Sequence, residues 1–118
     1  MPPSVRDPST FLPLTPQVLQ ILLSLSDGPV HGYAVINDIR ERTDGEMQLT
    51  ASTLYDALAR LLDHALIAEI DPPDDERDSR RRYYALTPLG RDVLASETRR
   101  LERLLAMARQ KRTLRERR

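Results

Sequence analysis

One predicted helix begins its outer face with small and polar side chains, where long charged ones are usual. The helix lies in the segment LTASTLYDALARLLDHALIAEI, residues 49–70, with Thr50 as its N-cap. Leucines at helical spacing form its inner face: Leu54, Leu58, Leu61, Leu62 and Leu66. A helix start with short side chains can enter a groove of DNA, and its free N–H groups favour a phosphate. The candidate DNA-contact residues on this face are Ala51, Ser52, Thr53, Tyr55, Asp56 and Arg60.

The chemistry of these side chains suits a major groove. The methyl group of Ala51 can pack on a thymine methyl, and the hydroxyls of Ser52 and Thr53 can bond to phosphates or base edges. The hydroxyl of Tyr55 can reach a phosphate, whereas Asp56 must accept from a cytosine amino group or face solvent. The alternative is a capped helix start that serves only structure, with Tyr55 packing on its neighbours.

Three consecutive arginines open a predicted strand further along the chain, after the polar turn PPDDERDSR. We expect Arg80 and Arg82 to clamp phosphates beside the groove. The alternative is that these arginines neutralise the acidic residues just before them. The turn carries acidic residues and no glycine, so deep insertion of its tip into a minor groove is not expected.

The order of the predicted elements defines the fold class. Three short helices, the third beginning after Thr50, precede the strands ALIAEID and RRRYYALT, which should pair as a hairpin. Thr87 and Pro88 begin a last helix that runs to about Lys111. The chain is therefore predicted to be mainly α with a β-hairpin wing: a winged helix-turn-helix with a long C-terminal helix. We expect a flexible arm at 1–11, a DNA-binding domain at 12–87, a dimerisation helix at 88–111 and a basic tail at 112–118.

The last helix has an apolar seam with heptad-like spacing, formed by Leu94, Leu101, Leu104, Leu105 and Ala108. A single small domain cannot cover so long a helix on both sides, so a second subunit is the expected partner. The alternative is packing against the first helix of the same chain, and both arrangements can hold together. Two-fold symmetry would then present two third helices to half-sites about one DNA turn apart.

Composition limits the class of protein. The chain has 118 residues, 40% of them hydrophobic and 31% charged, and contains no cysteine. No stretch reads as a membrane span or a signal peptide, so a cytoplasmic location is expected. The net charge is zero, but residues 97–118 hold nine basic and three acidic side chains, and residues 1–96 hold nine and fifteen. The basic tail could bind DNA backbone, although a solvated helix end is the commoner meaning of such a run.

An enzyme is not expected. His31 and His64 have no paired nucleophile, and the chain shows no phosphate-binding glycine loop and no metal-ligand spacing. We therefore expect no cofactor and no metal. His31 should bond locally and His64 should lie at a helix end. Of Tyr83 and Tyr84, which alternate along a strand, one should fill the core and the other face outward.

Four segments together resemble the PadR family of bacterial transcriptional regulators: DGPVHGYAV, TASTLYDALARLLDHALI, RRYYALTPLG and the final helix. The resemblance covers about residues 12 to 108 and implies a homodimeric repressor of double-stranded DNA with a single C-terminal dimerisation helix. It also implies a small hydrophobic or aromatic effector, since some members respond to such ligands. The chain departs from the family pattern at Ser52, where glycine is common, at His64–Ala65, and in its acidic wing.

The alternative function is a winged helix that binds another protein without sequence-specific DNA binding. The acidic wing and the zero net charge favour this alternative. A titration against promoter DNA separates the two, because only the repressor hypothesis predicts specific, salt-sensitive binding.

Overall fold

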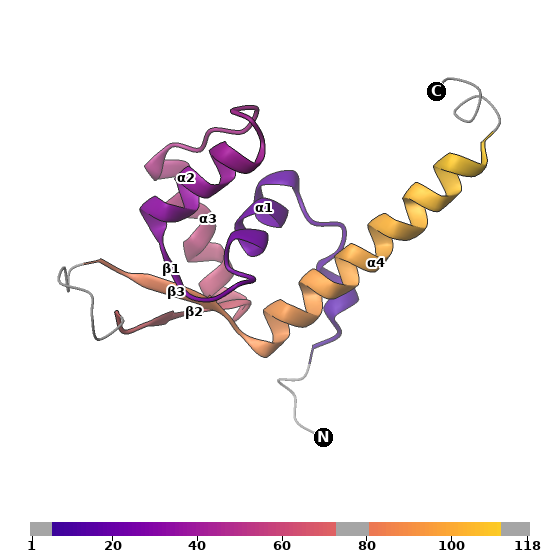
Figure 1. The fold of residues 1–118 in the computed structure, drawn as a ribbon. Helices are drawn as coiled ribbons and strands as arrows, with labels where there is room; N and C mark the ends of the chain where they lie inside the picture. Colours follow the sequence, from indigo (N-terminus) through magenta and orange to yellow (C-terminus); the bar gives the residue numbers. More distant parts are fainter. Residues whose placement is uncertain (1–5, 73–80, 112–118) are drawn as a thin grey trace.

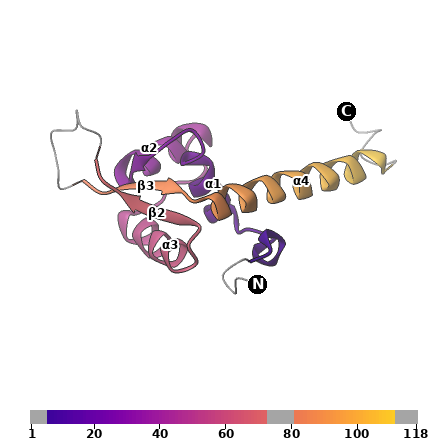
Figure 2. The same cartoon turned by 90° about the horizontal axis from the view of Figure 1, so that it is seen from below.

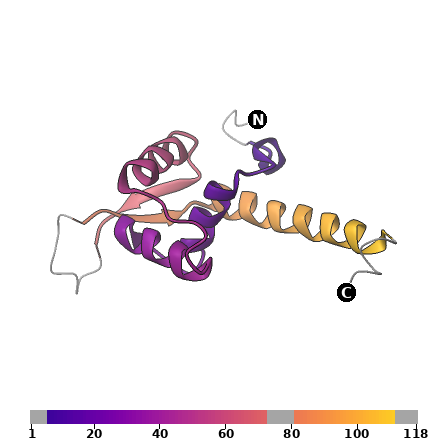
Figure 3. The same cartoon turned by 90° about the horizontal axis from the view of Figure 1, so that it is seen from above.

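The computed structural model describes residues 6–72 and 81–111, and it has the predicted fold (Figure 1). Its elements are η1 (Pro8–Phe11), α1 (Pro16–Ser24), β1 (Val30–His31), α2 (Gly32–Arg42), α3 (Ala51–Asp63), β2 (Ile67–Ile70), β3 (Tyr83–Leu86) and α4 (Pro88–Gln110). Three helices and a small sheet form the domain, and α4 extends away from it. The β2–β3 hairpin and the far end of α4 lie at opposite ends of the molecule in all three views (Figures 1, 2 and 3).

Three threonines begin helices, and two of them, Thr50 and Thr87, do so as predicted. The hydroxyls of Thr15, Thr50 and Thr87 each accept the backbone N–H three residues further on, at 3.2, 3.1 and 3.0 Å. Each of these bonds satisfies one of the N–H groups that a helix start leaves without a partner. Proline follows the cap in α1 and α4, where its missing N–H costs nothing.

The sheet has one strand more than the predicted hairpin. Strand β1 pairs antiparallel with β3, so the strand order is β1-β3-β2. This addition corrects the expectation that one of the two tyrosines faces outward. Tyr84 fills the core as expected, at 3% exposure, but Tyr83 is buried too, at 9% exposure, with its ring edge-on to His31 of β1. A two-residue strand leaves no periodicity from which it could be predicted.

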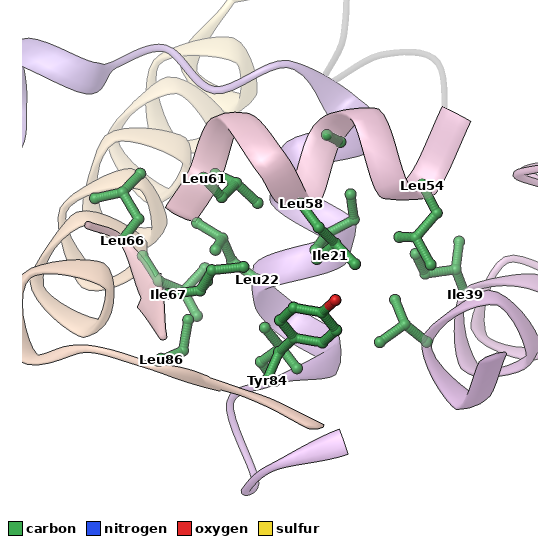
Figure 4. Packing of buried hydrophobic residues seen from close by; sticks show 14 of the residues in the cluster. Ile21, Leu22, Ile39, Leu54, Leu58, Leu61, Leu66, Ile67, Tyr84 and Leu86 are labelled. Carbon is green, nitrogen blue, oxygen red and sulfur yellow. The ribbon is translucent and has the colours of Figure 1, made fainter. Parts of the chain in front are cut away.

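One hydrophobic core joins the three helices to the sheet (Figure 4). The inner leucines of α3 pack against α1 and against the strands, as the spacing predicts, and Leu54 and Leu58 are essentially inaccessible. On α1, Leu22 and Leu25 are buried, whereas Val18 and Leu19 are only partly covered. Ile21 of the same helix is fully buried as well.

The start of α4 is docked onto the turn between α3 and β2. The hydroxyl of Thr87 donates to the carbonyl of Ala65 at 2.6 Å, and the N–H of Thr87 donates to the carbonyl of Leu66 at 3.1 Å. A Cβ atom added to Gly90 would lie 2.0 Å from that Leu66 oxygen. Glycine at this position therefore lets the helix backbone approach the turn closely, which fixes the direction in which α4 leaves the domain.

Residues 6–11, part of the arm expected at 1–11, contact the rest of the domain in the structure. Asp7 caps the one-turn helix η1, which packs against α4. Arg6 lies over the ring of Phe11 and donates to the carbonyl of His64, and the Phe11 and His64 rings meet edge-on at 5.7 Å. These are contacts between distant parts of the chain, so a short proline-rich segment gave no local sign of them.

Candidate nucleic-acid and subunit interfaces

The first turns of α3 present the predicted outer face to solvent. Ala51, Ser52 and Asp56 are exposed, and Tyr55 is 45% exposed. Thr53 is half-buried because its hydroxyl accepts a hydrogen bond of 3.0 Å from the cap hydroxyl of Thr50. This surface is therefore made of a methyl group, a hydroxyl, a phenol and a carboxylate, with no long side chain that would hold a partner away.

Tyr55 also packs against the start of α2. A Cβ atom added to Gly32 would lie 2.5 Å from the Tyr55 hydroxyl oxygen and 2.9 Å from Cζ of the ring. The Tyr55 side chain therefore occupies the space that a Cβ atom at Gly32 would need. The ring position of Tyr55 is thus set by packing, while almost half of the residue remains accessible.

A hollow of about 510 Å³ lies beside Tyr55, between the start of α2, α3 and β3. We call it the basic hollow, and its lining residues are His31, Gly32, Tyr33, Tyr55, Arg81, Arg82 and Tyr84. Of the predicted DNA contacts that the structure describes, only Tyr55 and Arg82 line it. Tyr33, at 66% exposure, could have been found from the sequence, because it lies opposite the inner residues Val35 and Ile39 on a helix.

His31 connects the backbone of α2 to this hollow. Its Nδ1 accepts the N–H of Ala34 at 3.2 Å and so forms the N-cap of α2, in agreement with the expectation of a local bond. Its Nε2 lies 3.2 Å from Nη1 of Arg81. Sequence reasoning favoured Arg80 and Arg82 over Arg81, because it could not know that β1 places a histidine opposite the strand.

Arg82 and Tyr84 form a second polar group in the hollow. The guanidinium of Arg82 lies 3.8 Å from the Glu69 carboxylate, across the β2–β3 pair. Burial, with a smaller effect of Glu69, raises the pKa of the Tyr84 hydroxyl, which therefore stays protonated at neutral pH. Arg80 and the acidic residues from position 74 to 78 lie outside the described residues.

Arg60 lies apart from the basic hollow. It lines a second, smaller cavity of about 200 Å³ between the N-terminal segment, α1 and the last turns of α3. Phe11, Leu14, Val18, Ala57, Leu61 and His64 are among the other lining residues. The structure therefore separates Arg60 from the other candidate contacts, although its side chain is exposed.

The predicted subunit seam divides into two parts. Leu94, which was expected in the seam, is 8% exposed and belongs to the core of its own domain, because the first half of α4 packs back against α1. Leu101, Leu104 and Leu105 are 38%, 45% and 50% exposed. Ala108, in the next turn, is half-buried. The seam of exposed leucines therefore begins one turn after Glu97 and is shorter than the sequence suggested.

The described residues show two further limits on chemistry. No cluster of three or more acidic or histidine side chains that could hold a metal ion occurs within 6–72 and 81–111. Over the same ranges, no helix is long and apolar enough to cross a membrane. The arrangement that is present, with arginines, a histidine and three phenols around one hollow, suits binding of an anionic group.

Comparison with known proteins identifies relatives. The pattern of the transcriptional regulator PadR-like family matches residues 21–96. An uncharacterized 37.1 kDa protein in transposon TN4556 of Streptomyces fradiae is 40% identical over 84 residues, which cover 71% of this chain and 22% of that protein. The chain thus spans about a fifth of the length of this curated relative.

Solved structures share the fold. A PadR family transcription regulator from Clostridium difficile is 29% identical, with a TM-score of 0.66 over 78% of this chain and 95% of its own. Bacillus subtilis PadR, solved in complex with operator DNA, is 23% identical, with a TM-score of 0.60 over 71% of this chain and 47% of its own. The Bacillus protein supports the fold alone.

Proposed function

The chain belongs to the PadR-like family of transcriptional regulators, and we propose that it is a homodimeric repressor that binds operator DNA through two copies of α3. The family consists of regulators and not of enzymes. One observation carries the proposal: the outer face of α3 begins with short, exposed side chains and adjoins the basic hollow. A helix of this kind can bring its first turn to the base edges of a major groove while neighbouring cations bind the backbone.

The proposed DNA contacts fall into two classes. Ala51, Ser52 and Asp56 face the base edges, and Thr53 supports the first turn through its bond to Thr50. Tyr55 and Arg82 contact phosphates, and so do Arg60 and Arg80, which belong to the same proposal although Arg60 lies further from the hollow. The Bacillus subtilis protein that shares this fold was solved in complex with operator DNA, so the fold is compatible with DNA binding.

A footprint on promoter DNA of its own or a neighbouring gene tests the proposal. We expect two protected patches about 10 base pairs apart, one for each copy of α3. Binding should weaken steeply with salt, because each neutralised phosphate adds about 0.9 to the slope of log affinity against log salt. Absent or salt-insensitive binding would favour the alternative, a winged helix that binds another protein.

Substitution of Tyr55 tests the proposed phosphate contact most directly. Tyr55→Phe keeps the ring that packs on Gly32 and removes only the hydroxyl, so it should weaken operator binding without unfolding the protein. Tyr55→Ala removes both and should weaken binding more. Tyr83→Phe is the matched control, since Tyr83 is a buried tyrosine that is not among the residues lining the hollow.

Dimerisation is proposed through the second half of α4. Leu101, Leu104 and Leu105 lie three and four residues apart on a helix whose second half leaves the domain, and burying them requires a second copy. Repression would follow if the dimer occupies promoter DNA that the polymerase needs. A promoter–reporter fusion distinguishes the outcomes, because deletion of a repressor raises expression and deletion of an activator lowers it.

A small hydrophobic or aromatic effector is a second part of the proposal, favoured by the cavity of about 200 Å³. Ala57, Leu61 and His64 of α3 line it, so a bound ligand would contact the same helix whose first turn faces DNA. A panel of phenolic and cationic aromatic compounds tests this idea. A compound that raises the melting temperature and changes operator affinity supports it, and a panel without effect on either refutes it.

A further inference from the structure

Both ring nitrogens of His31 lie within hydrogen-bond distance of a donor, and one imidazole ring cannot accept from both. Nδ1 lies 3.2 Å from the backbone N–H of Ala34, and Nε2 lies 3.2 Å from the guanidinium of Arg81. Both neighbours are donors, since arginine has no acceptor and is always charged. A neutral imidazole has a single acceptor nitrogen, and a protonated one has none. The ring can therefore accept from only one of the two.

The backbone bond decides which nitrogen accepts. The N–H of Ala34 belongs to the first turn of α2 and has no partner within its helix, so the cap at Nδ1 satisfies a group that would otherwise be left unbonded. With Nδ1 accepting, the proton of a neutral ring is on Nε2. The Nε2–H and the Arg81 guanidinium are then two donors next to each other at the wall of the basic hollow.

From this pair we infer a preformed site for one DNA phosphate, in which a single phosphate oxygen accepts from both His31 Nε2–H and Arg81. The inference rests on the proposed function and adds two residues to it. The hollow offers about 510 Å³, enough for a phosphate group, and its rim carries the exposed phenol of Tyr33. Tyr55, proposed above as a phosphate contact, lies on the same hollow and next to Gly32, the residue that follows His31.

Two variants separate the hydrogen bond from the charge. His31→Asn keeps an oxygen that can cap α2, since asparagine is a favoured N-cap, but removes the Nε2–H donor. Arg81→Gln removes the positive charge. Each should weaken operator binding about tenfold for each subunit of the dimer, the usual effect of one hydrogen bond to a charged group. With a neutral imidazole only Arg81→Gln removes a charge, so only this variant should lower the salt slope, by about 1.8 for the two copies in a dimer.

Neutral backbone linkages show whether the partner is a phosphate. A series of operator duplexes, each with a symmetric pair of methylphosphonates, one in each half-site, should contain one pair that weakens binding by the wild-type protein about tenfold for each subunit. On that duplex His31→Asn and Arg81→Gln should lose nothing further, since their partner is already gone. Arg91→Gln, which removes an exposed arginine from the first turn of α4, is the control and should bind every duplex like the wild type.

Three results would overturn the inference. The first is specific operator binding by the wild type that both variants match within a factor of two, which would leave the proposed function intact. The second is a loss that stays the same on every methylphosphonate duplex, which would mean that the two residues act on the fold. The third is a shift of the His31 resonances by inorganic phosphate in a protein that binds no DNA, which would make a free phosphate the ligand and would also refute the proposed function.

Discussion

The two halves of α4 belong to one continuous helix, yet their surroundings are opposite. The first half, from Pro88 to Glu97, buries Gly90, Val93 and Leu94 against the domain. The second half leaves the domain and exposes Leu101, Leu104 and Leu105 (Figure 1). Both halves contain leucines, so hydrophobicity alone does not distinguish a helix face that is buried in the monomer from one that is exposed.

Glu97 marks the boundary between the halves. It is 1% exposed, accepts the N–H of Leu14 at 3.0 Å and pairs with Arg100 at 2.5 and 3.0 Å. A carboxylate inside a hydrophobic seam would be costly in a simple coiled coil, but here it ties the N-terminal segment to α4. The burial of the first half makes it part of the monomer core, and the exposure of the second half leaves its leucines accessible to a second subunit. Four predictions test this division, from the largest expected effect to the smallest.

Gly90→Ala should destabilise the packing of the first half of α4 against the domain. Helix propensity alone predicts a gain of about 1 kcal/mol, whereas overlap of the new Cβ with the Leu66 backbone predicts a loss of about 3 kcal/mol or more. Urea denaturation followed by circular dichroism measures the sign. Ala95→Gly, at an exposed position of the same helix, should cost only about 1 kcal/mol, and a stabilised Gly90→Ala variant would contradict the packing described here.

Leu101→Ser combined with Leu105→Ser should break the second half and leave the monomer folded. Burial of each leucine in a dimer is worth about 2 kcal/mol, so the dimer dissociation constant should rise at least about a hundredfold. Sedimentation equilibrium measures this change, and operator affinity should fall with it. Arg103→Ser, on the opposite face of the helix, should leave the association unchanged. A wild-type protein that is monomeric at all concentrations would refute the proposed dimer.

Glu97→Gln should lower the free energy of unfolding by an amount that depends on pH. The hydrogen bond from Arg100 holds the pKa of the Glu97 carboxyl below its usual 4.5, against the opposing effect of burial. A depressed native pKa stabilises the fold above the unfolded value, and this contribution is lost as pH falls below 4.5 and through the native pKa. The variant should cost about 2 kcal/mol at neutral pH, and the difference from wild type should shrink in acid.

Unfolding curves at several pH values measure that difference. Glu102→Gln removes the same charge from an exposed position of α4 and serves as the matched control. A cost for Glu97→Gln that is the same at pH values above and below 4.5 would mean that the carboxylate charge does not stabilise the N-terminal segment on α4.

Ala65→Gly should stabilise the turn between α3 and β2, on which the start of α4 packs. Ala65 has a φ of +60°, a conformation that costs an alanine about 1 kcal/mol and a glycine almost nothing. Part of this gain is offset by the greater freedom of glycine in the unfolded chain, so we expect about 0.5 kcal/mol of stabilisation. Thermal denaturation detects it, and Ala59→Gly within α3 should instead destabilise. A lower melting temperature for Ala65→Gly would contradict the left-handed turn.

The helix starts and the order of the elements could be predicted from local signals. Thr15, Thr50 and Thr87 are capping residues at the correct distance from an apolar run, and each of them begins a helix in the structure. The outer face of α3 was equally readable, because a buried leucine stripe leaves the remaining side of a helix to solvent. These features depend on interactions between residues that are a few positions apart.

Sequence patterns could not predict the features that depend on distant contacts. The basic hollow unites His31, Tyr55 and Arg81 only because β1 pairs with β3 and because Gly32 leaves room for a phenol. In the same way, the N-terminal turn depends on α4, and Leu94 became a core residue instead of a seam residue.

The sequence by itself thus determined the fold class, the helix starts and the exposed face of α3, since periodicity and capping are local. Tertiary structure alone decided which cationic side chains lie beside that face and at which residue α4 ceases to pack against its own domain. The physical reason is that both depend on close approaches, of the Tyr55 side chain at Gly32 and of the Leu66 backbone at Gly90, and these distances are set by the packing of the whole core.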